Sequence, residues 1–250
     1  KDAMIVIKRG SSLTIDGNGV ISGDNIPVAI KVTGTNDSKD ENAEIAKLIV
    51  NGGTIKGSTY GISGNGTRHN TYIEINNGNI NGNFAIYHPQ DGEMVITGGK
   101  ITGNNTGIEI RSGDLTITGG EISGDTEIFN QTDNGGGPTT IGAALAISQH
   151  TTNKDINVTI SGGKFTGYYA VVEKDLRDGG GNINLNITGG EFDGKIYGQT
   201  VKDFITGGTF TDPTALHYLG EGANVQVNLK DNYSGEEVDA LNADKAFEIE

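Results

Sequence analysis

The chain contains no cysteine, so disulfide bonds, thiolate metal sites and a cysteine nucleophile are all excluded. Lysine and arginine are also scarce: 18 of them stand against 32 acidic residues, and the formal net charge is −14. Because nucleic-acid binding depends on clustered cations that neutralise phosphates, this balance argues against a nucleic-acid partner. We interpret the acidic excess as a solvated surface; a calcium-binding surface is the alternative.

Several other signals are missing. No apolar run reaches the ~20 residues of a membrane span, so we expect no membrane insertion. The sequence has no Gly-x-Ser-x-Gly elbow, no Gly-Lys-Ser/Thr phosphate loop and no metal-ligand spacing among its four histidines. We therefore expect neither a cofactor nor a metal. The chain opens at Lys1 inside an expected strand, so we expect it to be a module of a longer protein.

What the chain does contain is a glycine-rich repeat, with 41 glycines against four prolines. The stretch Met94-Val-Ile-Thr-Gly-Gly-Lys-Ile-Thr-Gly returns 21 residues later as Leu115-Thr-Ile-Thr-Gly-Gly-Glu-Ile-Ser-Gly, and recognisable copies run from Leu13 to Phe210. A repeated unit of this kind cannot bury its own apolar face and needs neighbours to stack on. The repeat therefore predicts one continuous solenoid.

Each copy has the same internal order. An apolar-x-apolar triplet alternates as a strand does, a glycine corner follows, and a second short strand carries one inward apolar residue. A third apolar segment comes next, for example Glu127-Ile-Phe and Ala143-Ala-Leu-Ala-Ile. The pattern predicts an all-β parallel β-helix of about eight rungs with three strands per rung. The inward residues of the second strands would form an interior ladder with neighbours ~4.8 Å apart, made of Ile21, Ile55, Ile80, Ile101, Ile122, Phe165, Phe192 and Phe210.

The outward positions and the insertions fit the same register. Lys100 is expected over Glu121, and Lys164 over Glu191, as opposite charges on adjacent rungs. Extra residues are expected after the third segment, at 33–44, 64–71, 130–140 with 148–155, and 174–182. Insertions that share one corner of a solenoid lie along one edge, where repeat proteins usually bind.

The pattern ends near residue 211, so we expect a solenoid over 1–211 and a cap over 212–229. Asp212 followed by Pro213 predicts a short helix over 213–219, and the alternation from Ala223 predicts a strand after it. These elements would close the apolar end of the coil. Residues 230–250 are acidic and predict a linker or tail.

The Ile-Thr-Gly-Gly-x-Ile-x-Gly rungs resemble the right-handed, single-stranded parallel β-helix superfamily typified by pectate lyases. The chain is more closely similar to β-helix modules in adhesins and other surface proteins of Gram-positive bacteria, and to some phage fibre and tailspike segments. The resemblance covers about 13–211 and lies in ladder and turn positions. It implies an extracellular place on the bacterial cell surface, or on a virion, and a glycan or host surface receptor as partner.

Catalytic chemistry has little support in the sequence. The outward column of the first strands holds Glu74 as its only carboxylate, which cannot assemble the calcium site of a pectate lyase. Two carboxylate pairs suit the spacing of a glycoside hydrolase, namely Glu109 with Glu127, and Asp91 with Glu93. Ordinary surface carboxylates are the alternative.

Aromatic rings recur on the third segments beside charged residues and the long loops. Rings flanked by polar groups stack on sugars while hydrogen-bonding their hydroxyls. We therefore hypothesise a glycan- or receptor-binding edge with no catalytic residues, and Tyr168 or Tyr169 belongs to the same recurrence. Rings that pack beneath their own loops are the alternative. The candidate ligand-binding residues are Tyr60, Arg68, His69, Tyr87, His88, Glu109, Arg111 and Phe129.

The functional expectation is a non-catalytic cell-surface module for adhesion, monomeric in itself. A polysaccharide-degrading enzyme, either a lyase or a glycoside hydrolase, is the first alternative. A phage or virion fibre segment, which would be trimeric, is the second.

Overall fold

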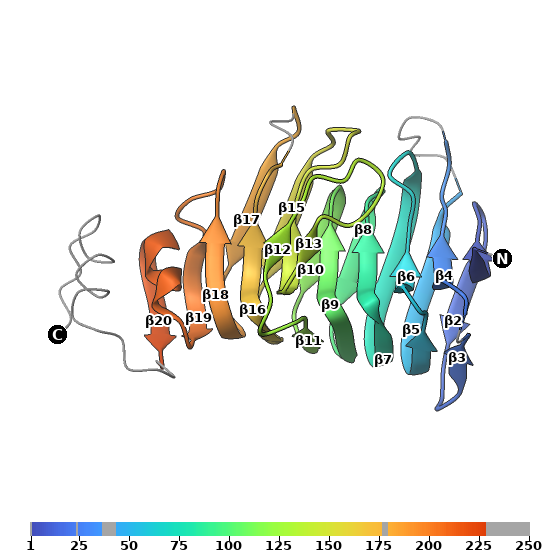
Figure 1. Ribbon diagram of the computed structural model, residues 1–250, viewed down its shortest axis with the longest axis horizontal. Helices are drawn as coiled ribbons and strands as arrows, with labels where there is room; N and C mark the ends of the chain where they lie inside the picture. Colours follow the sequence, from blue (N-terminus) through green and yellow to red (C-terminus); the bar gives the residue numbers. More distant parts are fainter. Residues whose placement is uncertain (1, 24, 37–43, 177–179, 229–250) are drawn as a thin grey trace.

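The computed structural model describes residues 2–23, 25–36, 44–176 and 180–228. All but two of their strands belong to one sheet of 18 strands that closes round a single long axis, and the described residues contain only one short helix. The pairing within this sheet is parallel throughout, consistent with a β-helix-like solenoid (Figure 1). The expected tail at 230–250 lies outside the described residues.

The strands form three columns of in-register segments, and the long strands pass from one column to the next. The first column comprises β2 (Ser12–Ile15), the starts of β5 (Ala46–Lys56) and β7 (His69–His88), β8 (Asp91–Ile96), β10 (Gly113–Ile117), β15 (Ile156–Ile160) and β17 (Ile183–Ile187). The second column comprises β3 (Val20–Ser22), the later parts of β5 and β7, the starts of β9 (Lys100–Ile110), β16 (Lys164–Glu173) and β18 (Glu191–Gly198), β11 (Glu121–Ser123), β19 (Ile205–Phe210) and β20 (Leu219–Val227).

The third column carries the candidate site. It comprises β1 (Ala3–Ile7), β4 (Val28–Val32), β6 (Tyr60–Ser63), β14 (Ala143–Ile147) and the ends of β7, β9, β16 and β18. We call its outer surface the third-column face. Residues 124–142, which join β11 to β14, form a strap that contains the antiparallel pair β12 (Asn130–Gln131) and β13 (Thr140–Ile141).

The interior ladder is confirmed. Each of its residues is paired with the next along the second column, and all but Ile21 are buried. At the C-terminal end the rings of Phe165, Phe192 and Phe210 stack with centroids 4.9 and 4.8 Å apart and planes tilted by only 9°. That spacing is the separation of parallel strands, so identical inward positions place one ring directly on the next.

The corners and the outward charges also follow the sequence pattern. The second glycine of each Gly-Gly corner has a positive φ, 85° at Gly99 and 92° at Gly120, a region that other residues rarely enter. The Lys100 ammonium lies 3.8 Å from the Glu121 carboxylate. Lys164 and Glu191 form the second such pair at 4.0 Å. These pairs are exposed, so each contributes little to stability.

The C-terminal segment holds the predicted short helix as a 3-10 helix, η1 (Pro213–Tyr218). The Asp212 carboxylate accepts a hydrogen bond of 2.9 Å from the backbone N–H of Thr214, which fixes its start. Ala215 joins the buried core, and the Tyr218 ring stacks on Phe204 at 4.9 Å. β20 then pairs in parallel with β19, so it continues the column of strands.

One sequence assignment is wrong. Glu127-Ile-Phe is not a third-column strand, because β14 pairs directly with β9 and β16 and occupies that rung. The insertion at 130–140 therefore precedes its third-column strand and crosses the sheet as the strap. The inserted loops at 64–71 and 148–155 rise along one edge of the solenoid, the upper edge in Figure 1. Residues 37–43 and 177–179, within the other two predicted insertions, lie outside the described residues.

Candidate functional site

The third-column face and the strap over it bring together five of the predicted residues, namely Tyr60, Tyr87, Glu109, Arg111 and Phe129. Tyr60 lies beside Phe84, and Tyr87 lies between Ser63 and Glu109, on neighbouring strands. The Tyr60 ring centroid is 6.0 Å from that of Phe84 and 5.7 Å from that of Tyr87. We call these three the Tyr60 ring group.

Tyr87 is the most enclosed member of this group. Only 5% of it is exposed, and its hydroxyl accepts a hydrogen bond of 3.4 Å from the Arg111 guanidinium. Burial raises the pKa of Tyr87 to about 12, against the lowering effect of Arg111. Tyr60 and Phe84 are half-buried, so they are the rings of this group that a ligand can reach.

Glu109 points away from the core of the solenoid but is fully buried under the strap. The backbone N–H of Thr139 donates to both of its carboxylate oxygens, at 2.8 and 3.0 Å, and the Thr139 hydroxyl donates at 2.9 Å. The N–H of Thr140 adds a fourth hydrogen bond at 3.2 Å. Burial raises the pKa of Glu109 to about 7, while these hydrogen bonds and Arg111 lower it. Because both carboxylate oxygens of Glu109 accept hydrogen bonds from Thr139 and Thr140, this side chain anchors the strap.

Arg111, just after the end of β9, also anchors the strap. Its buried guanidinium donates to the carbonyl oxygens of Asn134 and Gly137, both at 2.6 Å, and to that of Gln149 at 2.5 Å. Its Nε lies 3.9 Å from a Glu109 oxygen, and both side chains are 0% exposed. Glu109 and Arg111 together hold the strap against the middle of the third-column face, where Figure 1 shows β12 and β13 crossing the solenoid.

Phe129 lies on the strap and belongs to a second set of rings. It packs on Ala143, Ala146 and Val172, small residues that leave room for it on the strands below. Its centroid lies 5.8 Å from that of Tyr168, in a stacked arrangement, and 4.6 Å from that of Tyr169. We call Phe129, Tyr168, Tyr169 and Tyr197 the Tyr168 ring group.

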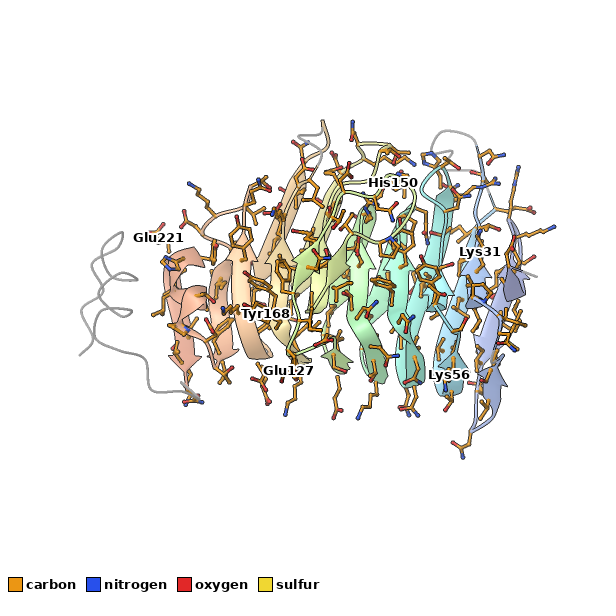
Figure 2. The ribbon with its side chains drawn as sticks, viewed as in Figure 1. Lys31, Lys56, Glu127, His150, Tyr168 and Glu221 are labelled. Carbon is orange, nitrogen blue, oxygen red and sulfur yellow. The ribbon has the colours of Figure 1, made fainter. Side chains whose placement is uncertain are left out.

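The Tyr168 ring group is the more open of the two. Tyr197 is 36% exposed and lies 6.3 Å from Tyr169, between ring centroids. The Lys195 ammonium stands 4.8 Å above the centroid of Tyr168, and it reaches the Tyr168 hydroxyl at 3.4 Å. Figure 2 labels Tyr168 at mid-height on the solenoid, away from the loop edge.

Arg68 and His69 lie apart from both ring groups, on the loop edge. The His69 ring forms a hydrogen bond of 3.1 Å to Asp91 through Nδ1, and its Nε2 lies 3.0 Å from the Lys154 ammonium. Lys154 also donates to the backbone carbonyl of Arg68 at 3.4 Å, and burial lowers the pKa of Lys154. This cluster joins the loop at 64–70 to the loop at 150–155.

His88 is fully buried at the end of β7 and cannot touch a ligand in this arrangement. Its Nδ1 lies 3.1 Å from the side-chain nitrogen of Gln90, and burial lowers its pKa to about 4. It therefore stays neutral at physiological pH and belongs to the packing of the corner.

The predicted pair of Glu109 with Glu127 does not form, because Glu109 is buried beneath the strap and Glu127 is exposed on it. Glu109 pairs in register with Ala146, whereas Glu127 lies on the strap at the lower edge of the solenoid in Figure 2. Asp91 is already bonded to His69, and Glu93 beside it is exposed. Within the described part of the chain, no group of three histidine or acidic residues is placed to hold a metal ion. No helix there is long and apolar enough to cross a membrane.

Sequence reasoning missed three members of this face, Phe84, Lys195 and Tyr197. The signal for the last two was weak, because Lys195 follows Gly194 directly, whereas Tyr169 follows Gly167 by two residues, so the spacing of the earlier third segments is not kept. β18 places Lys195 beside Tyr169, and Tyr197 beside Val172.

Comparison with known proteins adds no further assignment. No family model matches this chain, and no match is found among curated proteins or solved structures.

Proposed function

We propose that this chain is a non-catalytic, cell-surface β-helix module that binds a glycan, free or on a host receptor, through its third-column face. The proposal includes the finer description of the fold, a right-handed coil of three strands per rung like that of the pectate lyase superfamily. It also includes an extracellular location on a bacterial cell, which follows from that resemblance.

The observation that carries the proposal is the Tyr168 ring group. Phe129, Tyr168, Tyr169 and Tyr197 form a continuous chain of ring contacts, 4.6 to 6.3 Å between centroids, on the outside of the sheet. Partly exposed rings with polar tips can stack on the C–H faces of sugars while their hydroxyls hydrogen-bond the ligand. Lys195 adds a cation beside the rings.

Rigidity supports the same conclusion. Phe129 is held over the sheet by the strap, to which Glu109 and Arg111 make six hydrogen bonds among the described residues. Arg111 makes one more, to the carbonyl oxygen of Gln149 in the following loop. Rings fixed before the ligand arrives lose little conformational freedom on binding, which favours affinity.

The net charge of the chain limits the class of glycan that it can bind. A net charge of −14 repels polyanions at long range, although salt screens this repulsion beyond about 10 Å. Neutral and amino-containing glycans are therefore the favoured class.

A polysaccharide-degrading enzyme remains a second proposal, and one observation favours it. Asp91, His69 and Lys154 form a hydrogen-bonded chain at 3.1 and 3.0 Å, the arrangement that a general base and its orienting group require. Incubation with polysaccharides separates the two proposals, because new reducing ends that disappear in His69→Gln would show turnover.

The binding proposal is tested on a glycan array with the wild type and with Tyr168→Ala combined with Tyr197→Ala. The matched control is Tyr72→Ala, because Lys47 stands 4.7 Å above the Tyr72 ring just as Lys195 stands above Tyr168, but on the first column. We expect binding of the wild type to a defined set of glycans, loss in the double variant and no change in Tyr72→Ala. Equal binding by all three proteins would contradict the proposal.

A further inference from the structure

A hollow of about 440 Å³, lined by polar residues and glycines, lies on the outside of the solenoid, at the turn between the second and third columns. Its position is the edge opposite the inserted loops, where Figure 2 labels Lys56. Ser58 precedes Tyr60 by two residues and Gly82 precedes Phe84 by two, so the hollow and the Tyr60 ring group lie on the two sides of one turn. The lining residues used here are Lys56, Ser58, Asn81, Gly82, Thr102 and Asn104.

The strand register explains why this place is hollow. Lys56, Asn81 and Thr102 are paired in order on β5, β7 and β9, so their side chains form one outward column. The position after Asn81 is Gly82, and a Cβ there would lie 2.8 Å from the carbonyl oxygen of Phe84. No side chain can fill the turn, so its floor is bare backbone.

The side chains around the hollow have hydrogen-bonding groups to spare. Among the described residues, the Asn81 amide has no hydrogen-bond partner and Lys56 has no ion pair. Asn104 uses its nitrogen in a hydrogen bond of 3.1 Å to Asn83, which leaves its carbonyl oxygen as an acceptor. The Ser58 hydroxyl donates to the carbonyl oxygen of Ile26 at 3.2 Å and keeps an acceptor, and the Thr102 hydroxyl accepts from Ser123 at 3.4 Å and keeps a donor. The hollow thus offers an amine, amides and one free function of each hydroxyl.

A second hollow of about 450 Å³ shows the contrast. It also lies on the outward side of the second column, but its charged groups are already paired. Lys164 lies 4.0 Å from Glu191, and Thr211 donates to Asp193 at 3.1 Å. The two hollows therefore differ in one respect: Lys56 has no ion pair among the described residues, whereas Lys164 lies beside a carboxylate.

We infer that the hollow at Asn81 is a binding site for a short, uncharged saccharide. Mixed donors and acceptors around a backbone floor match a polyhydroxylated ligand, and Lys56 is the only charge among the lining residues. The column from Lys56 to Thr102 spans three strands, or about 10 Å at the spacing of parallel strands, which suits two linked sugar rings lying along the solenoid axis. This site is separate from the Tyr168 ring group and rests on the proposed function only for its ligand class.

The test follows the side-chain amide signals of Asn81 and Asn104 by NMR during titration with maltose, cellobiose and N,N′-diacetylchitobiose. We expect at least one disaccharide to shift both signals saturably. Asn81→Leu keeps the branched shape of the side chain and removes its amide. It should weaken the binding roughly tenfold, as measured from the Asn104 signal. Thr102→Val is the second variant and should weaken it in the same direction.

The matched control is Thr166→Val, because Thr166 occupies the same outward column as Thr102, with Ser123 between them. It should leave the titration unchanged, and so should Tyr168→Ala with Tyr197→Ala. Unshifted amides with all three disaccharides, or equal affinity in Asn81→Leu and wild type, would overturn the inference. If only the tyrosine double variant abolished the shifts, the Tyr168 ring group would account for all of the binding. The hollow would then be excluded as a binding site, and the proposed function would still stand.

Discussion

The carboxylate of Glu109 and the backbone N–H of Thr139 are joined at 2.8 and 3.0 Å, although 30 residues separate them in the sequence. This contact fixes the strap over the third-column face and converts an outward-pointing acid into a buried one. Removing it should be costly, because Arg111 would be left buried without a counter-charge and the Thr139 N–H without an acceptor.

Glu109→Ala is therefore expected to lower the free energy of unfolding by about 3 to 5 kcal/mol. The control is Glu127→Ala, an exposed acid on the same strap, which should change it by less than about 0.5 kcal/mol. Urea unfolding followed by circular dichroism measures both. Equal stability of the two variants would show that Glu109 does not anchor the strap.

His88 predicts a loss of stability in acid. Burial lowers its pKa from 6.5 to about 4, so the folded state disfavours the protonated ring. Its contribution is complete above pH 6.5 and is lost as the pH falls through 4, with a total of about 3 kcal/mol. The measurement is the unfolding free energy of wild type minus that of His88→Gln across this range. A difference that does not vary with pH would contradict the buried neutral state of His88.

Glu109 predicts the opposite trend. Burial raises its pKa from 4.5 to about 7, so the folded state favours the protonated acid. Its contribution is complete below pH 4.5 and is lost as the pH rises through 7, again about 3 kcal/mol in total. Wild type should therefore lose stability relative to Glu109→Gln between pH 4.5 and 7. A gain over that interval would mean that hydrogen bonds and Arg111 outweigh burial at this carboxyl.

The glycine corners give a prediction independent of charge. Gly120 has a φ of 92°, and a Cβ there would lie 2.9 Å from the carbonyl oxygen of Gly98 on the neighbouring rung. Gly120→Ala should cost about 1 to 3 kcal/mol in the unfolding free energy. Gly136→Ala is the control, because nothing lies within 4 Å of its Cβ position. Thermal unfolding of both variants measures the difference. Equal melting temperatures would show that the corner does not require glycine at position 120.

The sequence predicted the solenoid well, for a reason visible in Ile101 and Ile122. Both follow a Gly-Gly corner by the same number of residues, and they are paired in register and buried. The repeated spacing sets the register from local information alone. The outward Lys100 and Glu121 pair follows from the same register.

The candidate site was less predictable. Period-two alternation placed Glu109 outward, but its burial depends on Thr139, which the strap brings back from far along the chain. The strap itself was misassigned, because Glu127-Ile-Phe carries adjacent apolar residues and comes first in the chain, before the true strand at Ala143–Ile147. Only the pairing of β14 with β9 distinguishes them. Local pattern cannot determine such tertiary contacts.

The most direct test of glycan binding at the third-column face is chemical-shift mapping of the labelled protein with its strongest array ligand. We expect the largest backbone amide shifts at Phe129, Tyr168, Tyr169 and Tyr197, the members of the Tyr168 ring group. Shifts confined to the loop edge around His69 and Lys154, with none at these four residues, would contradict the proposal.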